Sequence, residues 1–197
     1  MKNPEKLPLN MNKKEIRKIY QEFHVPKHII AHMKTVAKVA KKLVRKMNKK
    51  GAKIDEETIE NAALLHDVVR YIDFKKPEAN DHECWKNLRK KYRKIGHEKA
   101  MAKILQKRGE KTLAKLIAKH GFFSVWKLKS IEEKILYYAD KRVDRDKIVT
   151  LEVRFSEGKK RNMLPTDDPQ LIKATEKKIF ELEQEFIEIL GESIYQL

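Results

Sequence analysis

The sequence has 197 residues, enough for one domain of ordinary size with its own hydrophobic core. Its hydrophobic content of 41% is that of a globular protein, whereas its charged content of 38% is well above the usual ~25%. The formal net charge of +17 predicts attraction to anions such as phosphorylated metabolites, RNA or acidic lipid. A single cysteine, Cys84, excludes a disulfide framework and a thiolate metal cluster, and no apolar run approaches the length of a membrane span.

Lysine and glutamate dominate the charged residues, beside many isoleucines and leucines, a bias that resembles that of heat-adapted proteins. The single cysteine and an N-terminus without an apolar segment favour a reducing cytoplasm as the compartment. Basic residues concentrate in two runs, 41–53 and 86–94. We expect both runs to be mainly solvated helix faces, with contact to nucleic acid as the alternative.

The first half of the chain predicts two amphipathic helices. Pro26 is followed by KHIIAHMKTVAKVAKKLVRKM, whose apolar residues recur at helical spacing until Gly51 ends the pattern. Asp55 then has the position of an N-cap for the next helix, which includes the stretch ENAALLHDVVRYID over 60–73. A loop and a short helix are expected over 74–95.

The second half predicts four further helices, each marked by a cap or by a glycine. Ser130 and Glu133 match a capping box, and Asp168 followed by Pro169 matches a cap with a proline at the first helical position. The expected bounds are 96–107 and 110–119, ended by Gly109 and Gly121, then 130–142 and 168–190.

The fold expected from these patterns is all-α. No segment keeps the alternating polarity of a strand, and no internal repeat is visible. We expect a single domain over 1–197, with a core at about 25–155 on which the C-terminal helix packs by ridges into grooves.

Polar residues interrupt the apolar faces of these helices at their inner ends. The face of the helix over 60–73 runs straight into His66, with Asp67 beside it. Burying a polar group without a hydrogen bond costs roughly 2–7 kcal/mol, so such a residue needs a partner. The same placement recurs on four other helices, and the residues concerned are His32, His66, Asp67, His97, His120 and Asp140.

A bound divalent metal is the simplest partner for this set of residues. Any one of the histidines could instead be a satisfied core or capping residue. Five helices that use only histidine and aspartate favour a metal, because a divalent ion accepts neutral imidazoles and carboxylates together. The remaining histidines, His24, His28 and His82, do not share the pattern.

The order His, His-Asp and Asp on helices resembles the HD-domain metal-dependent phosphohydrolases, whose fold is a helical bundle. The likeness covers about 25–155, through VPKHIIAHMKTVAKVA, AALLHD and EEKILYYADKRV. Two further matches, GHEKAMAKIL at His97 and LIAKHG at His120, resemble the subset that holds two metals. That subset includes the bacterial hydrolases of diadenosine tetraphosphate and the HD-GYP phosphodiesterases. The GYP motif is absent, since the chain after His120 reads GFFSVW.

The resemblance implies a ligand set for each of two ions and a set of residues that act on the substrate. One ion would be held by His32, His66, Asp67 and Asp140, and the other by Asp67, His97 and His120. Without a thiolate, these ligands suit Mn, Fe, Co, Ni or Zn. Asp67, Asp140 and Arg70 are the expected catalytic residues, and Arg70 stands where many relatives have a lysine that contacts phosphate. The candidate substrate contacts are Arg70, Lys141, Arg142 and Arg145, although Lys141 could equally be a cation at a helix C-terminus.

The expected function is hydrolysis of a phosphoester or phosphoanhydride bond in a nucleotide or related small substrate by metal-activated water. Two alternatives stay open: a phosphodiesterase or nuclease of the same family acting on RNA or DNA, and a non-catalytic helical module with structural metal. No membrane partner is expected. The sequence leaves the substrate, the metal and the oligomeric state undetermined.

Overall fold

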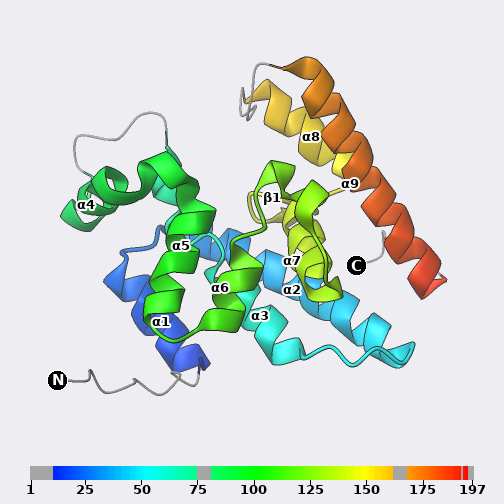
Figure 1. The fold of residues 1–197 in the computed structure, drawn as a ribbon, viewed down its shortest axis with the longest axis horizontal. Helices are drawn as coiled ribbons and strands as arrows, with labels where there is room; N and C mark the ends of the chain where they lie inside the picture. The colour runs from blue at the N-terminus through cyan, green and yellow to red at the C-terminus, as the bar shows by residue number, and fades with distance from the viewer. Residues whose placement is uncertain (1–10, 75–80, 162–167, 192, 195–197) are drawn as a thin grey trace.

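The computed structural model describes residues 11–74, 81–161, 168–191 and 193–194, and these residues are mostly helical (Figure 1). The α-helices within them are α1 Lys13–Glu22, α2 Lys27–Lys49, α3 Glu56–Leu65, α4 Glu83–Tyr92, α5 Gly96–Lys107, α6 Lys111–Ile117, α7 Ile131–Lys141, α8 Leu151–Lys160 and α9 Pro169–Leu190. The 3-10 helices η1 Arg70–Asp73, η2 Arg93–Ile95 and η3 Phe122–Lys127 lie between them.

The described residues contain no sheet larger than one short antiparallel hairpin. Its strands are β1 Val143–Asp144 and β2 Lys147–Ile148, with Val143 opposite Ile148. The expected all-α fold is therefore confirmed. The hairpin follows directly after α7 and returns the chain toward α2, which contacts both strands.

Several helix ends lie where the sequence predicts them. α2 ends at Lys49, two residues before Gly51. The φ of Gly51 is 96°, a backbone conformation that glycine adopts more readily than other residues. α7 begins with the capping box, in which the Ser130 hydroxyl accepts from the Glu133 backbone while the Glu133 carboxylate accepts from the Ser130 backbone. Asp168 caps α9 by accepting from two backbone N–H groups of its first turn, with Pro169 at the first helical position. α5 and α9 have the bounds that their caps and glycines predict.

The helix expected over 60–73 ends earlier than the sequence predicts. α3 stops at Leu65, and a turn leads from it into η1. The Nδ1 atom of His66 donates to the carbonyl oxygen of Ala63 at 2.7 Å, which is the acceptor that Asp67 N–H would use in a continuing α-helix. Competition for this carbonyl favours a tighter turn, which places two consecutive side chains at one site.

α6 also ends early, at Ile117 rather than near 119. The Nδ1 atom of His120 donates to the carbonyl oxygen of Ile117 at 2.6 Å, three residues before it. Gly121 was expected to end this helix, but its φ of −63° is ordinary. A Cβ atom on Gly121 would collide with the side chain of Glu98, so close approach is the physical reason for this glycine.

Two of the helices, α1 and α8, were not expected from the sequence. α8 buries only Leu151 among the residues of its stretch LEVRFSEGKK, so it has almost no apolar pattern to indicate a helix. Part of the loop expected after 74 lies outside the described residues, and the short helix expected there is α4.

The elements pack around α2, which contacts α3, α7 and α9. Figure 1 shows α1, α4 and α5 on the left of the molecule and α8 with α9 on the right. One cluster of buried apolar residues continues from Ile16 of α1 to Phe186 of α9, and the ring of Phe186 lies 5.1 Å from that of Tyr138. This continuity leads us to propose that the chain forms a single domain.

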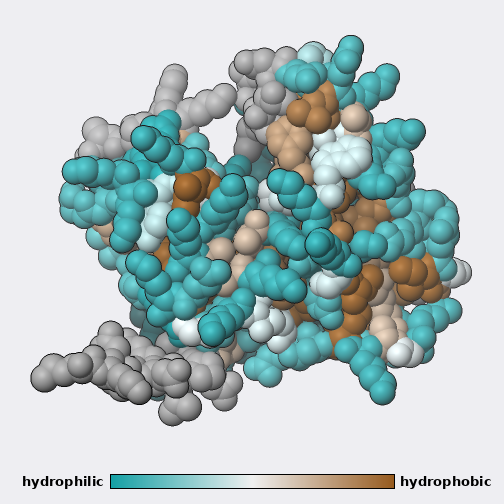
Figure 2. Space-filling view, viewed as in Figure 1, coloured by the Kyte–Doolittle hydropathy of each residue, from teal (hydrophilic) through white to brown (hydrophobic). Residues whose placement is uncertain are grey.

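The surface is dominated by polar residues, as the high charged content predicts. Figure 2 shows hydrophilic side chains over most of one face, with apolar residues in smaller patches between them. Among the described helices, none combines the length and the apolar character that crossing a membrane requires.

Candidate metal centre

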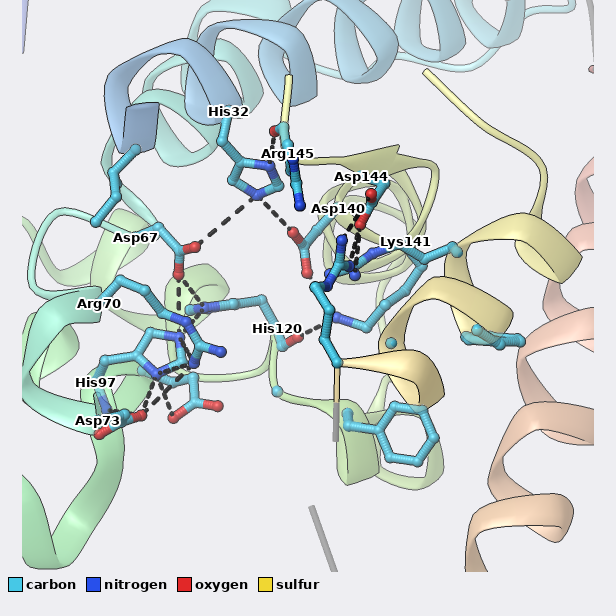
Figure 3. A pocket seen from close by; sticks show the side chains of 18 of the residues that line it. His32, Asp67, Arg70, Asp73, His97, His120, Asp140, Lys141, Asp144 and Arg145 are labelled. Carbon is cyan, nitrogen blue, oxygen red and sulfur yellow. Dashed lines mark hydrogen bonds and ion pairs between the residues drawn. The ribbon is translucent and has the colours of Figure 1, made fainter. Parts of the chain in front are cut away.

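The six histidines and aspartates that interrupt the apolar faces come together at one site. All of them except His66 are labelled in Figure 3. His32 comes from the second turn of α2, Asp140 from the last turn of α7 and His97 from the first turn of α5. The other three come from the turns that end α3 and α6 early, and they are His66, Asp67 and His120. All six are largely buried, with His66 fully inaccessible.

Two groups of ligand atoms form within this cluster, and Asp67 belongs to both. On one side, Oδ1 of Asp140 lies 3.1 Å from Nε2 of His32 and 3.5 Å from Nε2 of His66. The Oδ2 atom of Asp67 faces the same two nitrogen atoms at 3.8 and 3.7 Å.

On the other side, the Oδ1 atom of Asp67 lies 3.0 Å from Nε2 of His97 and 3.4 Å from Nε2 of His120. These two nitrogen atoms are 2.9 Å apart. Each oxygen of the Asp67 carboxylate therefore faces a different pair of histidines, as Figure 3 shows for the labelled residues.

Every histidine of the cluster is oriented by a hydrogen bond at its other ring nitrogen. Nδ1 of His32 donates to the carbonyl oxygen of Arg145 at 2.7 Å, and His66 and His120 donate to carbonyl oxygens of their own turns. Nδ1 of His97 donates to Oδ2 of Asp73 at 2.6 Å. Such bonds hold each ring so that its Nε2 atom points to the centre of the cluster, the orientation that metal-ligating histidines adopt.

The donor set fits a divalent metal. Nε2 of His66 is buried and has no hydrogen-bond partner among the described residues, an arrangement that is costly unless a ligand fills it. Burial raises the pKa of Asp67, but the neighbouring histidines outweigh it and hold this pKa well below its usual range. Burial likewise raises the pKa of Asp140, and Lys141 with the histidines outweighs it. Both carboxylates are therefore ionised and able to bind a cation.

Asp73 and Glu98 belong to the surroundings of His97, although nothing in the sequence singles them out. Burial and Arg70 lower the pKa of His97, but its hydrogen bonds to Asp67 and Asp73 outweigh them and raise it to about 9. Asp73, His97 and Glu98 also bring three ligand atoms together, with Oε2 of Glu98 at 3.5 Å from Nδ1 of His97. No sequence pattern indicates Asp73, because it meets His97 only in the folded chain, where η1 places it beside the start of α5.

Two of the four cationic residues expected to bind substrate, Arg70 and Arg145, line the pocket and are at least partly exposed. Nη1 of Arg70 lies 2.9 Å from Nδ1 of His97 and 3.6 Å from Asp73, and about a third of its side chain is exposed. Arg145 lines the same pocket, and its φ of 55° turns its carbonyl oxygen toward His32.

The other two candidate cations are engaged with the protein itself. Nζ of Lys141 donates to Oδ2 of Asp140 at 2.6 Å and to the carbonyl oxygen of His120 at 2.9 Å. Arg142 does not reach the pocket: it is 2% exposed, and its guanidinium donates to Tyr138 and to the carbonyl oxygen of Val149. Asp140 points to the histidines of the cluster, whereas Arg142 points into the core, where it cannot touch a substrate.

All members of the cluster except the fully buried His66 line a pocket of about 1040 Å³, at the upper end of the size of ligand sites. The pocket extends from His32 and Asp140 to α8 and α9, where Gly158 and Ile172 line it. His28, which the sequence analysis left outside the cluster, lines it too. His24 and His82 lie in neither group, and their rings stack on each other at 3.5 Å.

The two basic runs lie elsewhere on the molecule. Of the described residues that line the pocket, none comes from 41–53 or 86–94. Lys41 pairs with Glu60 at 2.8 Å. Arg89 is an exception to the expected solvation, because it is buried and donates to Asp81 at 2.7 Å.

Comparison with known protein families adds one finding. Residues 29–143, more than half of the chain, match the family model described as HD domain. This segment contains all six residues of the cluster. Neither the curated proteins nor the solved structures that were compared include a match to the chain.

Proposed function

The chain belongs to the HD domain family and carries a phosphohydrolase domain of that superfamily, and on this basis we propose that it hydrolyses a phosphoester or phosphoanhydride bond of a nucleotide or related small substrate. The observation that carries the proposal is the convergence of four histidine Nε2 atoms on Asp67 and Asp140 inside a pocket of ligand size.

Two divalent ions would be held by the two groups of ligand atoms, with Asp67 shared between them. This is the arrangement expected of the two-metal subset that the sequence resembles. The ligands proposed for the first ion are His32, His66, Asp67 and Asp140, and those for the second are Asp67, His97 and His120. The imidazole and carboxylate donors suit Mn, Fe, Co, Ni or Zn. Bound ions would supply Lewis acidity, which makes water nucleophilic near neutral pH and offsets charge on a phosphoryl group.

The residues of the chain would divide the remaining work. Arg70 and Arg145 pair with the phosphoryl oxygens as the bond to the leaving group breaks, because both line the pocket beside the cluster. Asp67 or Asp140, both ionised, accepts the proton of the attacking water. Lys141 holds the Asp140 carboxylate in place, since its ammonium group is engaged with that carboxylate.

A small substrate accounts for the site better than a nucleic-acid strand. The basic runs that would attract a polyanion do not line the pocket, within the described part of the chain. Arg70, Lys141 and Arg145, which do line it, lie beside the cluster, where a phosphate group of a small molecule would sit.

The proposal is tested by turnover of the protein reconstituted with Mn²⁺. The substrates are phosphomonoesters, cyclic nucleotides and dinucleoside polyphosphates, with short RNA as a separate arm. We expect hydrolysis of at least one small substrate, a loss of activity with full metal content in Arg70→Gln, and little change in Arg93→Gln, an exposed arginine of η2. Turnover of RNA alone, weakened by salt, would replace the proposal with the nucleic-acid alternative. Fully loaded protein that hydrolyses none of the substrates would leave only the non-catalytic module.

A further inference from the structure

The pocket is continued by a helix that lies beyond the segment matching the family. α8 begins at Leu151, whereas the match ends at residue 143. Three pocket-lining residues of α8 and the residue at its C-cap share one face by their spacing of three and four. This face, called here the α8 face, consists of Arg154, Phe155, Gly158 and Arg161.

Gly158 lies at the middle of the α8 face, and the fold does not explain it. A glycine inside a helix is less favourable than almost any other residue. No described atom lies within 4 Å of the position that a Cβ atom of Gly158 would occupy, so there is no close neighbour that requires a glycine. Gly96 and Gly121 differ, because a Cβ atom at either would collide with Glu98. The bare backbone at Gly158 instead leaves open space on the pocket side.

The charged groups around Gly158 are held by ion pairs that offset part of their charge. Asp144 accepts from Nη1 of Arg154 at 3.2 Å and from Nη1 of Arg161 at 3.0 Å, so one carboxylate fixes two guanidinium groups. Lys159 is paired with Glu176 at 2.9 Å.

The one aromatic residue of the α8 face, Phe155, is also held in place, by two other aromatic rings. The ring of Phe155 lies 6.3 Å from that of Phe122 and 5.8 Å from that of Phe180, in edge-to-face arrangements. A rigid ring and two fixed guanidinium planes around an open stretch of backbone suit a flat group with polar edges.

We propose that the α8 face binds the nucleoside of the substrate, with the base lying over Gly158 while the phosphate lies at the metal centre. The inference rests on the proposed function and narrows it, because a substrate without a base would leave this end of the pocket unfilled. Gly158 is then a specificity-determining residue: any side chain there would enter the space that the base occupies.

The test is a pair of probes that differ only by a nucleoside. The Mn²⁺-loaded protein is titrated calorimetrically with methylenediphosphonate and with the α,β-methylene analogue of adenosine diphosphate, neither of which is cleaved between its phosphorus atoms. We expect wild type to bind the nucleoside-bearing probe about tenfold or more tightly, the size of effect that stacking of one base contributes. Gly158→Leu should reduce this preference to less than about threefold and leave binding of methylenediphosphonate unchanged.

Ser156→Leu is the matched control, because Ser156 is exposed on the opposite side of the same helix. It should leave the affinity for both probes as in wild type. Both leucine variants should melt no lower than wild type, since leucine favours a helix more than glycine or serine does. A Gly158→Leu protein that melts far below wild type would show that the glycine serves the fold, which contradicts the inference.

The outcomes separate the inference from the function on which it rests. Equal binding of the two probes by wild type, or a preference that survives in Gly158→Leu, overturns the inference while the hydrolase proposal stands. Failure of the metal-loaded wild type to bind either probe overturns the hydrolase proposal and, with it, the inference.

Discussion

Replacing Asp73 by asparagine tests how the second group of ligand atoms is held together. Oδ2 of Asp73 accepts from Nδ1 of His97 at 2.6 Å and from the His97 backbone N–H at 3.3 Å. A carboxylate in this position orients the imidazole and makes it a stronger donor to a metal. Asparagine has the same shape as aspartate but no charge. In Asp73→Asn the His97 ring therefore keeps a side chain beside it but loses the charge-assisted hydrogen bond.

The size of the effect follows from that one bond. A hydrogen bond to a charged group is worth about 1.5–3 kcal/mol, and about 1.4 kcal/mol corresponds to a tenfold change in affinity. Asp73→Asn should therefore weaken binding of the ion beside His97 by about 10- to 100-fold, the range known for partners of metal-ligating histidines. The ion held by His32, His66 and Asp140 should be unaffected, because Asp73 contacts none of these residues among its described hydrogen bonds and ion pairs.

Calorimetric titration of the metal-free protein with Mn²⁺ measures both affinities. Asp55→Asn is the control, because Asp55 caps the other end of α3 and asparagine caps a helix equally well. Two binding steps that are identical in wild type and Asp73→Asn would refute the reasoning, as would an equal loss at both steps.

Two further predictions concern the surface charge and the stability of the fold. Charge reversal of two lysines in a basic run, such as Lys86→Glu with Lys90→Glu, should change hydrolysis of a small substrate by less than about tenfold, and a larger loss would bring the run at 86–94 into the active site. Burial raises the pKa of Glu133, but its bonds from Lys119 and from backbone N–H groups outweigh this and hold the pKa below its ordinary value of 4.5. This group therefore stabilises the fold above pH 4.5, and the contribution is lost as the pH falls through the lower folded-state pKa. Glu133→Gln should cost about 1–3 kcal/mol at pH 7 and progressively less below pH 4.5, and an equal difference in unfolding free energy at pH 7 and pH 3 would contradict the assignment.

The parts of the fold that the sequence predicts are those decided by local chemistry. Ser130 with Glu133, and Asp168 with Pro169, act on their own first turns, so the starts of α7 and α9 can be read directly from the chain. The residues of the cluster could be found for a related reason: each one continues an apolar face at helical spacing or, like Asp67, stands beside a residue that does. That spacing survives even where the helix itself ends early, as at His66.

The parts that the sequence does not predict depend on contacts between distant segments. Asp73 meets His97 across 24 residues, and no pattern in RYID indicates this. Lys141 and Arg142 are adjacent and look alike as phosphate ligands, yet successive residues of a helix point in different directions, so Lys141 reaches Asp140 whereas Arg142 reaches Tyr138. α8 could not be predicted because Leu151 is its only buried residue. For the same reason the sequence did not indicate which of its residues line the pocket.

The central claim is that Asp67 is shared by two metal ions, and it is tested most directly by metal content. Wild-type protein and the variants Asp67→Ala, His97→Ala and His120→Ala are reconstituted with Mn²⁺, desalted and measured by elemental mass spectrometry. The account predicts two ions per chain in wild type, the largest loss in Asp67→Ala, and one retained ion in each histidine variant. Asp67→Ala that keeps its full metal content and activity would contradict the account, because the one carboxylate whose oxygens face both pairs of histidines would then have no part in holding either ion.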